Sequence, residues 1–281
     1  MSTSRAWVLC ALLAGMAALA PVAAGVSVTG SITNVAPTIT SISLSGLVSG
    51  ALSPTAGTTT STTATVVATD LNGGSDITGV TVGIIKPDGS TVHLAEAAGT
   101  LQSSSGLTAT FTKVLTMNYY DAAALAGSTY KIKATATDSA SATGSNVLNL
   151  ALATFNYNQL VALSAPSSLA LSSAAGSSSG GTALSVNNYG NVQIDTQVSG
   201  TSLVGPSSVT LAVGDVTYSL NSGMSGPTAL TGSAATISAY DLAPANGAAK
   251  SIYFDLTPTT PAGGLPVGDY TGTLTVTAVS G

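Results

Sequence analysis

The sequence of 281 residues is poor in the side chains on which most enzymes depend. It contains one histidine, one cysteine and one tryptophan, and charged residues make up 6% of the chain, whereas about a quarter is typical of soluble domains. Serine-hydrolase chemistry would have to use His93, which we expect on the wet face of a short strand, residues 91–95, and no Gly-x-Ser-x-Gly motif accompanies it. A catalytic zinc site commonly combines several His or Cys ligands, which this chain lacks. We therefore expect no enzymatic activity.

Positive charge is scarce as well. Lys and Arg number six against eleven Asp and Glu, so the formal net charge is −5. So few cations form no basic patch that neutralises phosphates, and we expect no nucleic-acid partner. Hydrophobic residues reach 44%, but aromatic residues only 5%. Thr and Val favour strands, whereas helical proteins carry Glu, Lys, Arg and Leu on their surfaces, so the composition indicates an all-β fold.

The N-terminus predicts export. Arg5 precedes an apolar run, residues 6–20, and Pro21-Val-Ala-Ala24 follows with small residues, the pattern of a signal peptide cleaved after Ala24. The alternative is a transmembrane anchor, for which the run is short. Because Cys10 lies inside this run, the mature chain has no disulfide, and buried area must stabilise it. We expect a secreted protein, extracellular or at the cell surface, with no transmembrane segment in the mature chain.

Alternation with a period of two marks the strands. It is clearest after Gly127, where apolar or small residues at 130, 132, 134 and 136 alternate with Lys and Thr, the pattern of a strand with one buried face. A weaker version of this alternating pattern follows Gly268. Tyr130 is either a corner tyrosine bonded to the preceding loop or an ordinary core aromatic, and residues 120–125 are the one place where we expect a helical turn.

These strands predict two tandem immunoglobulin-like antiparallel β-sandwiches, residues 37–157 and 158–281, after a signal peptide (1–24) and an N-terminal strand (25–36). Candidate strands of the first lie at 38–45, 58–69, 77–85, 91–95, 107–117, 129–137 and 146–156. Those of the second lie at 183–187, 192–198, 208–212, 216–220, 235–240, 251–256 and 270–279. Seven short strands at this spacing with Gly-rich turns are typical of such a sandwich.

Particular motifs carry a resemblance to known families. Ala-Thr-Asp70-Leu-Asn-Gly-Gly-Ser-Asp76 and Gly-Ser-Thr-Tyr130 through Ala-Thr-Asp138 resemble immunoglobulin-like and polycystic-kidney-disease-type modules of prokaryotic surface proteins. Residues 186–195 and Gly-Asp-Tyr270-Thr-Gly are similar to sandwich modules of archaeal and bacterial cell-envelope proteins. The resemblance covers most of the mature chain and implies a structural, adhesive or assembly role, with other cell-surface proteins or copies of the same chain as partners.

An acidic group is the candidate metal site. Asp70 and Asp138 each end a predicted strand after the same Ala-Thr step, with Asn72 and Asp76 close behind the first. In an immunoglobulin-like sandwich the two following loops share one pole, so these residues are expected to converge. Carboxylate and carbonyl oxygens suit Ca²⁺, which takes six to eight of them. The alternative is that these residues only cap turns through their own backbone, with no cofactor bound.

The N-terminal strand is the candidate assembly element. Val26, Val28, Gly30 and Ile32 lie on one face and polar residues on the other. Such a strand can complete the sheet of a neighbouring subunit, and the second domain lacks a strand after its Gly-x-Tyr strand. The alternative is that residues 26–33 pair within their own chain as the first strand of domain one.

Sugar binding is a third possibility. Tyr119, Tyr120, Tyr189 and Tyr253 are able to stack on sugars, but no sequence pattern groups them, and the only tryptophan, Trp7, lies in the predicted signal peptide. We expect a non-catalytic structural or adhesive cell-surface protein. The alternatives are a filament or surface-layer subunit joined by strand donation and a carbohydrate-binding module.

Overall fold

The computed structural model describes residues 29–124, 127–146, 153–261 and 264–281. These residues form an all-β fold of several mainly antiparallel sheets, as the composition predicts, with 3-10 turns as the only helical elements described. No helix in these ranges is long and apolar enough to cross a membrane. The predicted signal peptide, Val26 and Val28 lie outside the described residues.

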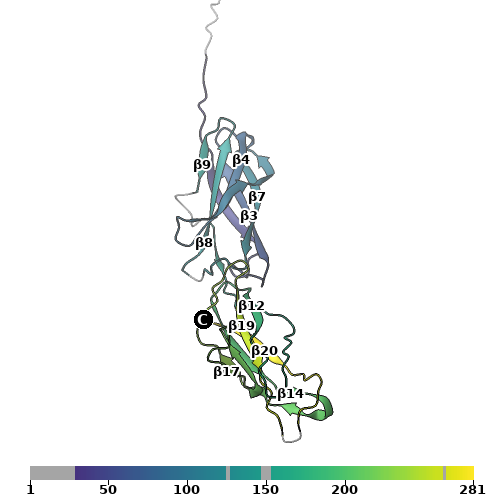
Figure 1. Cartoon of the computed structure of the whole chain (residues 1–281). Coiled ribbons are helices and arrows are strands. Elements are labelled where there is room, and N and C mark those ends of the chain that lie inside the picture. The colour runs from purple at the N-terminus through teal and green to yellow at the C-terminus, as the bar shows by residue number, and fades with distance from the viewer. Residues whose placement is uncertain (1–28, 125–126, 147–152, 262–263) are drawn as a thin grey trace, which may run out of the picture. The chain divides into compact units, whose positions relative to one another are not determined.

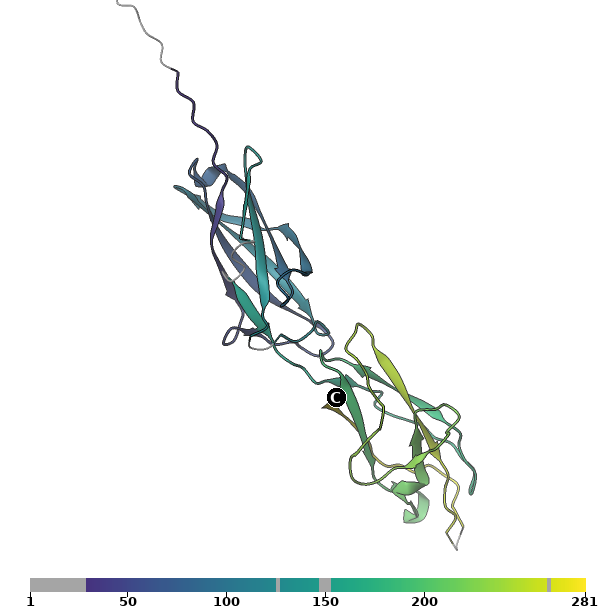
Figure 2. The ribbon, with the colours of Figure 1, turned by 90° about the vertical axis from the view of Figure 1, so that its left-hand side faces the viewer.

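The strands up to residue 157 form two sheets (Figures 1 and 2). The first has the order β1-β3-β7-β6, and the second β2-β10-β8-β4-β5 with β9 also on β8. The elements are β1 (Thr38–Ser45), β2 (Ala51–Leu52), β3 (Thr59–Thr69), η1 (Gly74–Asp76), β4 (Ile77–Ile85), β5 (Val92–Ala98), β6 (Thr100–Ser105), β7 (Thr108–Asn118), β8 (Tyr130–Asp138), β9 (Thr143–Ser145) and β10 (Thr154–Tyr157). All these pairings are antiparallel except that of β2 with β10.

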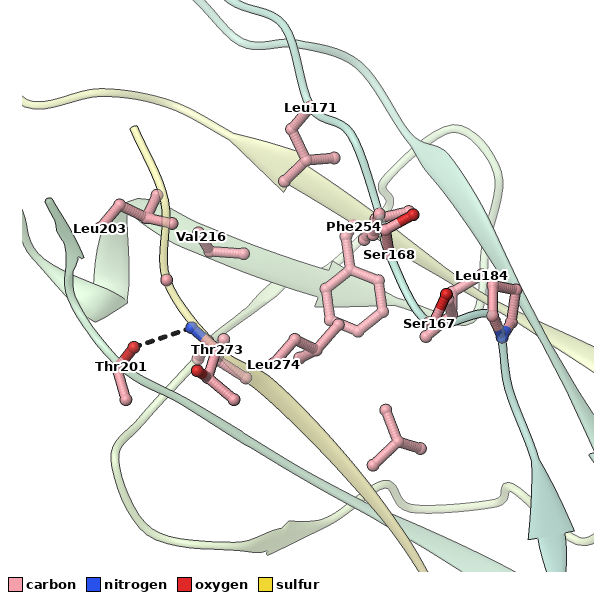
Figure 3. A pocket seen from close by; sticks show the side chains of 15 residues that line it. Ser167, Ser168, Leu171, Leu184, Thr201, Leu203, Val216, Phe254, Thr273 and Leu274 are labelled. Atoms are coloured by element: carbon pink, nitrogen blue, oxygen red, sulfur yellow. Dashed lines mark hydrogen bonds between the residues drawn. The ribbon is translucent and has the colours of Figure 1, made fainter. Parts of the chain in front are cut away.

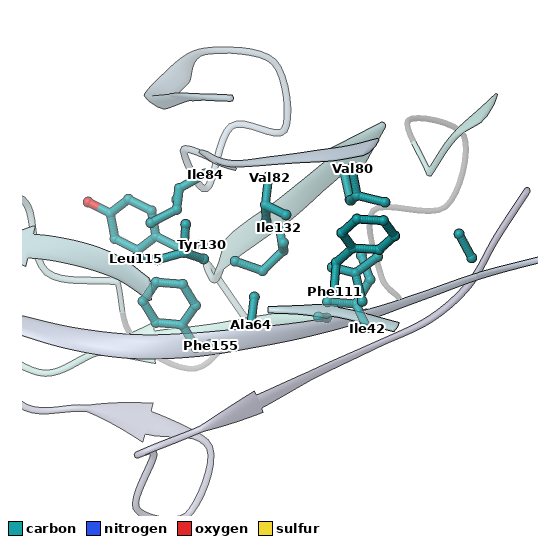
Figure 4. Close-up of a cluster of buried hydrophobic side chains, with 14 of the residues drawn as sticks. Ile42, Ala64, Val80, Val82, Ile84, Phe111, Leu115, Tyr130, Ile132 and Phe155 are labelled. Carbon is teal, nitrogen blue, oxygen red and sulfur yellow. The ribbon is translucent and has the colours of Figure 1, made fainter. Parts of the chain in front are cut away.

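The alternating residues of the two sheets meet in one hydrophobic core. On β8, every second residue from Tyr130 to Asp138 is buried and the residues between them are half-buried. Figure 4 shows Val80, Val82 and Ile84 of β4 facing side chains of the other sheet, among them Phe111. Most of these side chains are under 2% exposed. Dense packing of Val, Ile and Ala therefore stabilises this core, which contains no disulfide among the described residues.

Tyr130 is bonded to the preceding loop, as one of the two interpretations predicted. Its hydroxyl donates to the carbonyl of Ala122 at 2.9 Å, and its ring stacks on Phe155 with centroids 5.6 Å apart. Burial, and secondly the charge of Asp121, raise the pKa of Tyr130 to about 12. Its neutral form therefore stabilises the fold fully below about pH 10, the unfolded value, and this contribution is lost as the pH rises towards about 12.

Replacing Tyr130 with Phe should lower the free energy of unfolding by about 1 kcal/mol, because the Ala122 carbonyl loses its donor. Urea titration at neutral pH measures this loss. The same variant should lose less stability than the parent between about pH 10 and 12. Tyr253→Phe is the control, since this half-buried tyrosine of the C-terminal part has no hydroxyl hydrogen bond to another described residue. Equal losses of stability in the two variants would contradict the prediction.

The strands after residue 162 surround a second hydrophobic core. They form sheets of order β11-β12-β19-β16-β17, β18-β13-β20 and β14-β15. The elements are β11 (Leu163–Ser164), β12 (Thr182–Asn188), β13 (Ile194–Gly200), β14 (Leu203–Val204), η3 (Pro206–Ser208), β15 (Thr210–Leu211), η4 (Val213–Asp215), β16 (Val216–Ser219), β17 (Thr228–Ala229), β18 (Ala235–Thr236), β19 (Ala249–Leu256) and β20 (Leu274–Ser280). The core contains Phe254 and Ile252 of β19 and Ile194 of β13, all fully buried.

Several local predictions were wrong. Residues 29–33 form no strand within the single chain, so the interpretation that they are the first strand of the first sandwich is wrong, and the first strand of the sheets is β1. The helical turn expected at 120–125 is a non-helical turn in its described residues, 120–124. A strand not expected from the sequence, β6, follows β5 and pairs with β7. Its six residues are all exposed, so no buried alternation marks it.

Candidate functional site

Three carboxylates meet where the two sheets of the N-terminal part end. Asp70 follows β3, Asp76 ends η1 and Asp138 ends β8. One carboxylate oxygen of each lies within 4.8 Å of the other two. Asp70 and Asp138 are 1% and 2% exposed. Because buried positions recur every second residue along β3 and β8, both Asp side chains continue the core-facing row.

Hydrogen bonds hold each carboxylate in place. Asp70 Oδ1 accepts from the Asn72 backbone N–H at 2.7 Å, and Asp138 Oδ1 accepts from Ala142 N–H at 2.8 Å. The Ser139 hydroxyl donates to Asp76 Oδ1. The Ser139 N–H also donates to the Asp76 carbonyl at 2.9 Å. The β3–β4 and β8–β9 turns are therefore bonded to each other.

Asn72 is placed differently from the other predicted residues. Its Oδ1 accepts from the Val35 backbone N–H at 2.8 Å, so the side chain bonds the segment that leads into β1. Asp70, Asp76 and Asp138 are the acidic residues whose oxygens lie together. Of the four residues predicted from the sequence, three are brought together and Asn72 supports the turn.

A close backbone approach positions Asp76. A Cβ added to Gly74 would lie 2.1 Å from the Thr108 carbonyl oxygen, so only glycine fits there. Gly74 N–H donates to the Gly106 carbonyl at 2.8 Å, which ties η1 to the β6–β7 turn. The Gly-Gly pair in the sequence is the signal of this approach.

Asp70 has an unsatisfied oxygen. Its Oδ2 is buried and has no hydrogen-bond partner among the described residues. No Lys or Arg of the described ranges forms an ion pair with Asp70 or Asp76, since the pairs found are His93–Asp121 and Lys133–Glu96. A buried charged oxygen without a partner is costly, and this arrangement fits a group that binds a cation.

His93 is placed differently from the expectation that it faces water. Its Nε2 lies 3.1 Å from Asp121 Oδ2, with side chains 14% and 8% exposed, and its ring meets Tyr130 edge-on at 5.2 Å. Burial raises the pKa of Asp121, but bonds from His93 and the Asn118 backbone outweigh it, so the pKa lies below its ordinary value. No serine hydroxyl is bonded to His93 among the described residues, and the pair links the β4–β5 region to the 118–121 turn.

A groove opens beside β20 in the C-terminal part. Its volume is about 310 Å³, and it is lined by apolar side chains that include Leu184, Leu203, Phe254, Leu274 and Val276. Figure 3 shows Phe254 of β19 and Leu274 of β20 among these lining residues. The segment 166–171 borders the same groove without forming a strand.

β20 is an edge strand whose inner face is incompletely covered. It pairs with β13 but has no strand on its other side within the described ranges. Leu274, Val276 and Ala278 are only half-buried, whereas the corresponding alternate residues of β8 are almost fully buried. An unpaired strand edge next to an apolar groove is a template for another strand.

The predicted sugar-stacking tyrosines form no exposed platform. Tyr119 is 7% exposed and packs edge-to-face on Tyr120 with centroids 5.0 Å apart. Tyr119 also packs edge-on against Tyr189 of the C-terminal part, with centroids 5.7 Å apart. Tyr189 and Tyr253 are half-buried, and no ring contact joins Tyr253 to the other three in the described structure. No single exposed face unites the four tyrosines in the described structure.

The comparisons with known proteins add no family. Neither the models of protein families nor the curated proteins contain a match to this chain. The geometry of the molecule is therefore the basis on which its function is proposed.

Proposed function

We propose that this chain is an exported, non-catalytic structural protein of the cell surface, built from two immunoglobulin-like β-sandwich domains. The order β1-β3-β7-β6 against β5-β4-β8-β10 corresponds to strands A-B-E-D against C′-C-F-G of that fold. The bond from Tyr130 at the start of β8 matches a tyrosine corner. The signal-peptide pattern of residues 1–24 supports export.

A second candidate, favoured by the groove beside β20, is a filament subunit joined by strand donation. The donor would be residues 26–32, of which Ile32 is 94% exposed and lies in no strand. The acceptor would be the open edge of β20. In this assembly the exposed side chain of Ile32 would be buried against the edge of β20.

The lengths of donor and acceptor agree. A seven-residue strand spans about 23 Å at 3.3 Å per residue, and β20 also has seven residues. The apolar face of the donor carries Val26, Val28 and Ile32, and the half-buried residues of β20 expose a matching apolar row. Because the donor and acceptor surfaces differ, the contact is head-to-tail and gives an open chain of subunits.

Engineered cysteines test this assembly. Ile32→Cys, combined in turn with Leu274→Cys, Val276→Cys or Ala278→Cys, samples the registers in which same-face Cβ atoms lie about 4.5–5.5 Å apart. The only native cysteine, Cys10, lies in the predicted signal peptide. At least one pair should give a ladder of covalent multimers under non-reducing electrophoresis, and electron microscopy should show filaments.

Single-cysteine variants are the matched controls. They can form covalent dimers at most, because a chain with one thiol can form only one disulfide and cannot link two neighbours. Monomers in every pair, with no filaments at high concentration, would exclude strand donation and leave the first candidate. Secretion of the chain from cells would still test that candidate, because retention in the cytosol would contradict it.

A further inference from the structure

We infer that Asp70, Asp76 and Asp138 form a binding site for a hard divalent cation, Ca²⁺. This inference does not depend on strand donation. It rests on two observations, the convergence of three carboxylates within 4.8 Å and the unsatisfied, buried Oδ2 of Asp70.

Repulsion among the three negatively charged carboxylates is the first reason to infer a bound cation. Carboxylate oxygens within 4.8 Å of one another repel strongly when water is largely excluded, and Asp70 and Asp138 are almost fully buried. No basic side chain is paired with Asp70 or Asp76 in the described ranges. A divalent cation converts this repulsion into attraction.

The unsatisfied oxygen of Asp70 is the second reason to infer a bound cation. Turn capping explains Asp70 Oδ1, which accepts the Asn72 N–H, but leaves Oδ2 without a donor within the described structure. Buried polar atoms are nearly always satisfied by protein, water or an ion. If Asp70 served only as a cap, as Asp88 does for Ser90 and Thr91 in an exposed turn, an exposed position would be sufficient.

The donor atoms select the type of cation. The carboxylates lie on three separate segments, and the group contains no histidine or cysteine, so oxygen is the ligand on offer. Oxygen ligands favour Ca²⁺ or Mg²⁺ over zinc. Ca²⁺ accepts irregular sets of six to eight oxygens, including waters and carbonyls, whereas Mg²⁺ requires a near-ideal octahedron. Ligands fixed by turns rather than by a dedicated loop suit the more tolerant ion.

The site would stabilise the pole of the N-terminal part. It joins the end of β3, η1 and the end of β8, elements already linked by the Ser139–Asp76 bonds. Asn72 in the same turn bonds the Val35 N–H, so a cation that orders this turn also orders the chain entering β1. Bound Ca²⁺ is therefore expected to stabilise this part of the protein and not the other.

Thermal unfolding of the full mature chain tests the inference. After treatment with EDTA, about 10 mM CaCl₂ should raise the Tm of one transition by about 5 °C, for a Kd on the order of 10⁻³ M as in extracellular modules. MgCl₂ at the same concentration should raise it much less. Tb³⁺ luminescence, sensitised by tyrosine and displaced by Ca²⁺, provides a direct binding measurement.

Asp70→Asn has a distinctive expected result. It should abolish the Ca²⁺-induced shift and raise the Tm in EDTA by about 2 °C, because it removes one repelling charge. Asp76→Asn, at a half-buried position, is the second variant if the first does not fold. Asp269→Asn, which alters an exposed aspartate of the C-terminal part, is the control and should keep the full shift.

Two results would overturn the site. One is an equal Ca²⁺ shift in all three variants, which would indicate non-specific ion effects. The other is the absence, in the parent, of both a Ca²⁺-induced Tm shift and Tb³⁺ luminescence that Ca²⁺ displaces, which would mean that the three carboxylates bind no such cation.

Discussion

The Ile32→Asp chain is expected to remain monomeric at concentrations where the parent chain assembles. Ile32 is 94% exposed and lies in no strand of the single chain, so the monomer should keep its free energy of unfolding within about 0.5 kcal/mol. In the proposed assembly this side chain is buried in the apolar groove beside β20. An unpaired charge there should weaken association at least about 100-fold. Analytical ultracentrifugation and urea titration measure the two effects.

Thr33→Asp is the matched control for this charge. Thr33 is exposed and adjacent to Ile32, but alternation places it on the outward face of the donor strand. It should assemble like the parent. If Ile32→Asp destabilises the monomer, the segment instead packs within its own chain. If both variants assemble normally, the segment is not the donor.

The Asn188→Ala chain is expected to lose about 3 to 6 kcal/mol of unfolding free energy. Asn188 is fully buried at the end of β12. Its Nδ2 donates to the carbonyls of Val192 and Leu242, each at 2.9 Å, and its Oδ1 accepts from Gly190 N–H at 2.8 Å. Alanine leaves the Val192 carbonyl and the Gly190 N–H without partners, at about 1–3 kcal/mol each, and removes a third bond of about 1 kcal/mol from the Leu242 carbonyl, which keeps the Ile194 N–H as a donor. Urea titration should show the loss.

Asn187→Ala is the control, because this neighbour is half-buried on the opposite face of β12 and its side chain forms no hydrogen bond with the described residues. Its cost should stay within about 0.5 kcal/mol. The Asn188 effect should appear only in the unfolding transition of the C-terminal core, whereas the Tyr130 effect belongs to the N-terminal one. Equal losses for the two asparagines would show that the three bonds are not the cause.

The strands predicted best are those whose alternation is read directly from the chain. β3 and β8 bury every second residue, and both were predicted within two residues at each end. β6 was missed because all its residues are exposed, and its pairing with β7 supplies the only signal. In the C-terminal part, the strand expected at 235–240 is reduced to β18, Ala235–Thr236. Short strands there depend on neighbours far along the chain, which local patterns do not encode.

Contacts of specific side chains were predicted less well than strands. Asn146 donates to the Ile132 carbonyl and accepts from Ala134 N–H. It thereby bonds the part of β8 that lies between its pairings with β10 and β9, and no local sequence pattern indicates this role. His93 was expected on the wet face of its short strand. Its side chain instead bonds Asp121 and packs on Tyr130, so it is mostly buried. Such choices depend on partners brought together by the fold.

The amino-acid sequence alone determined that this chain is all-β, because period-two alternation of small apolar residues and Thr permits no other efficient burial. It also placed Asp70 and Asp138 at strand ends after the same Ala-Thr step. Only the tertiary structure decided that these carboxylates, with Asp76, share one buried pole while Asn72 bonds Val35. It alone left β20 as an open edge beside a groove, since the partners of a strand are set by long-range packing and not by its own residues.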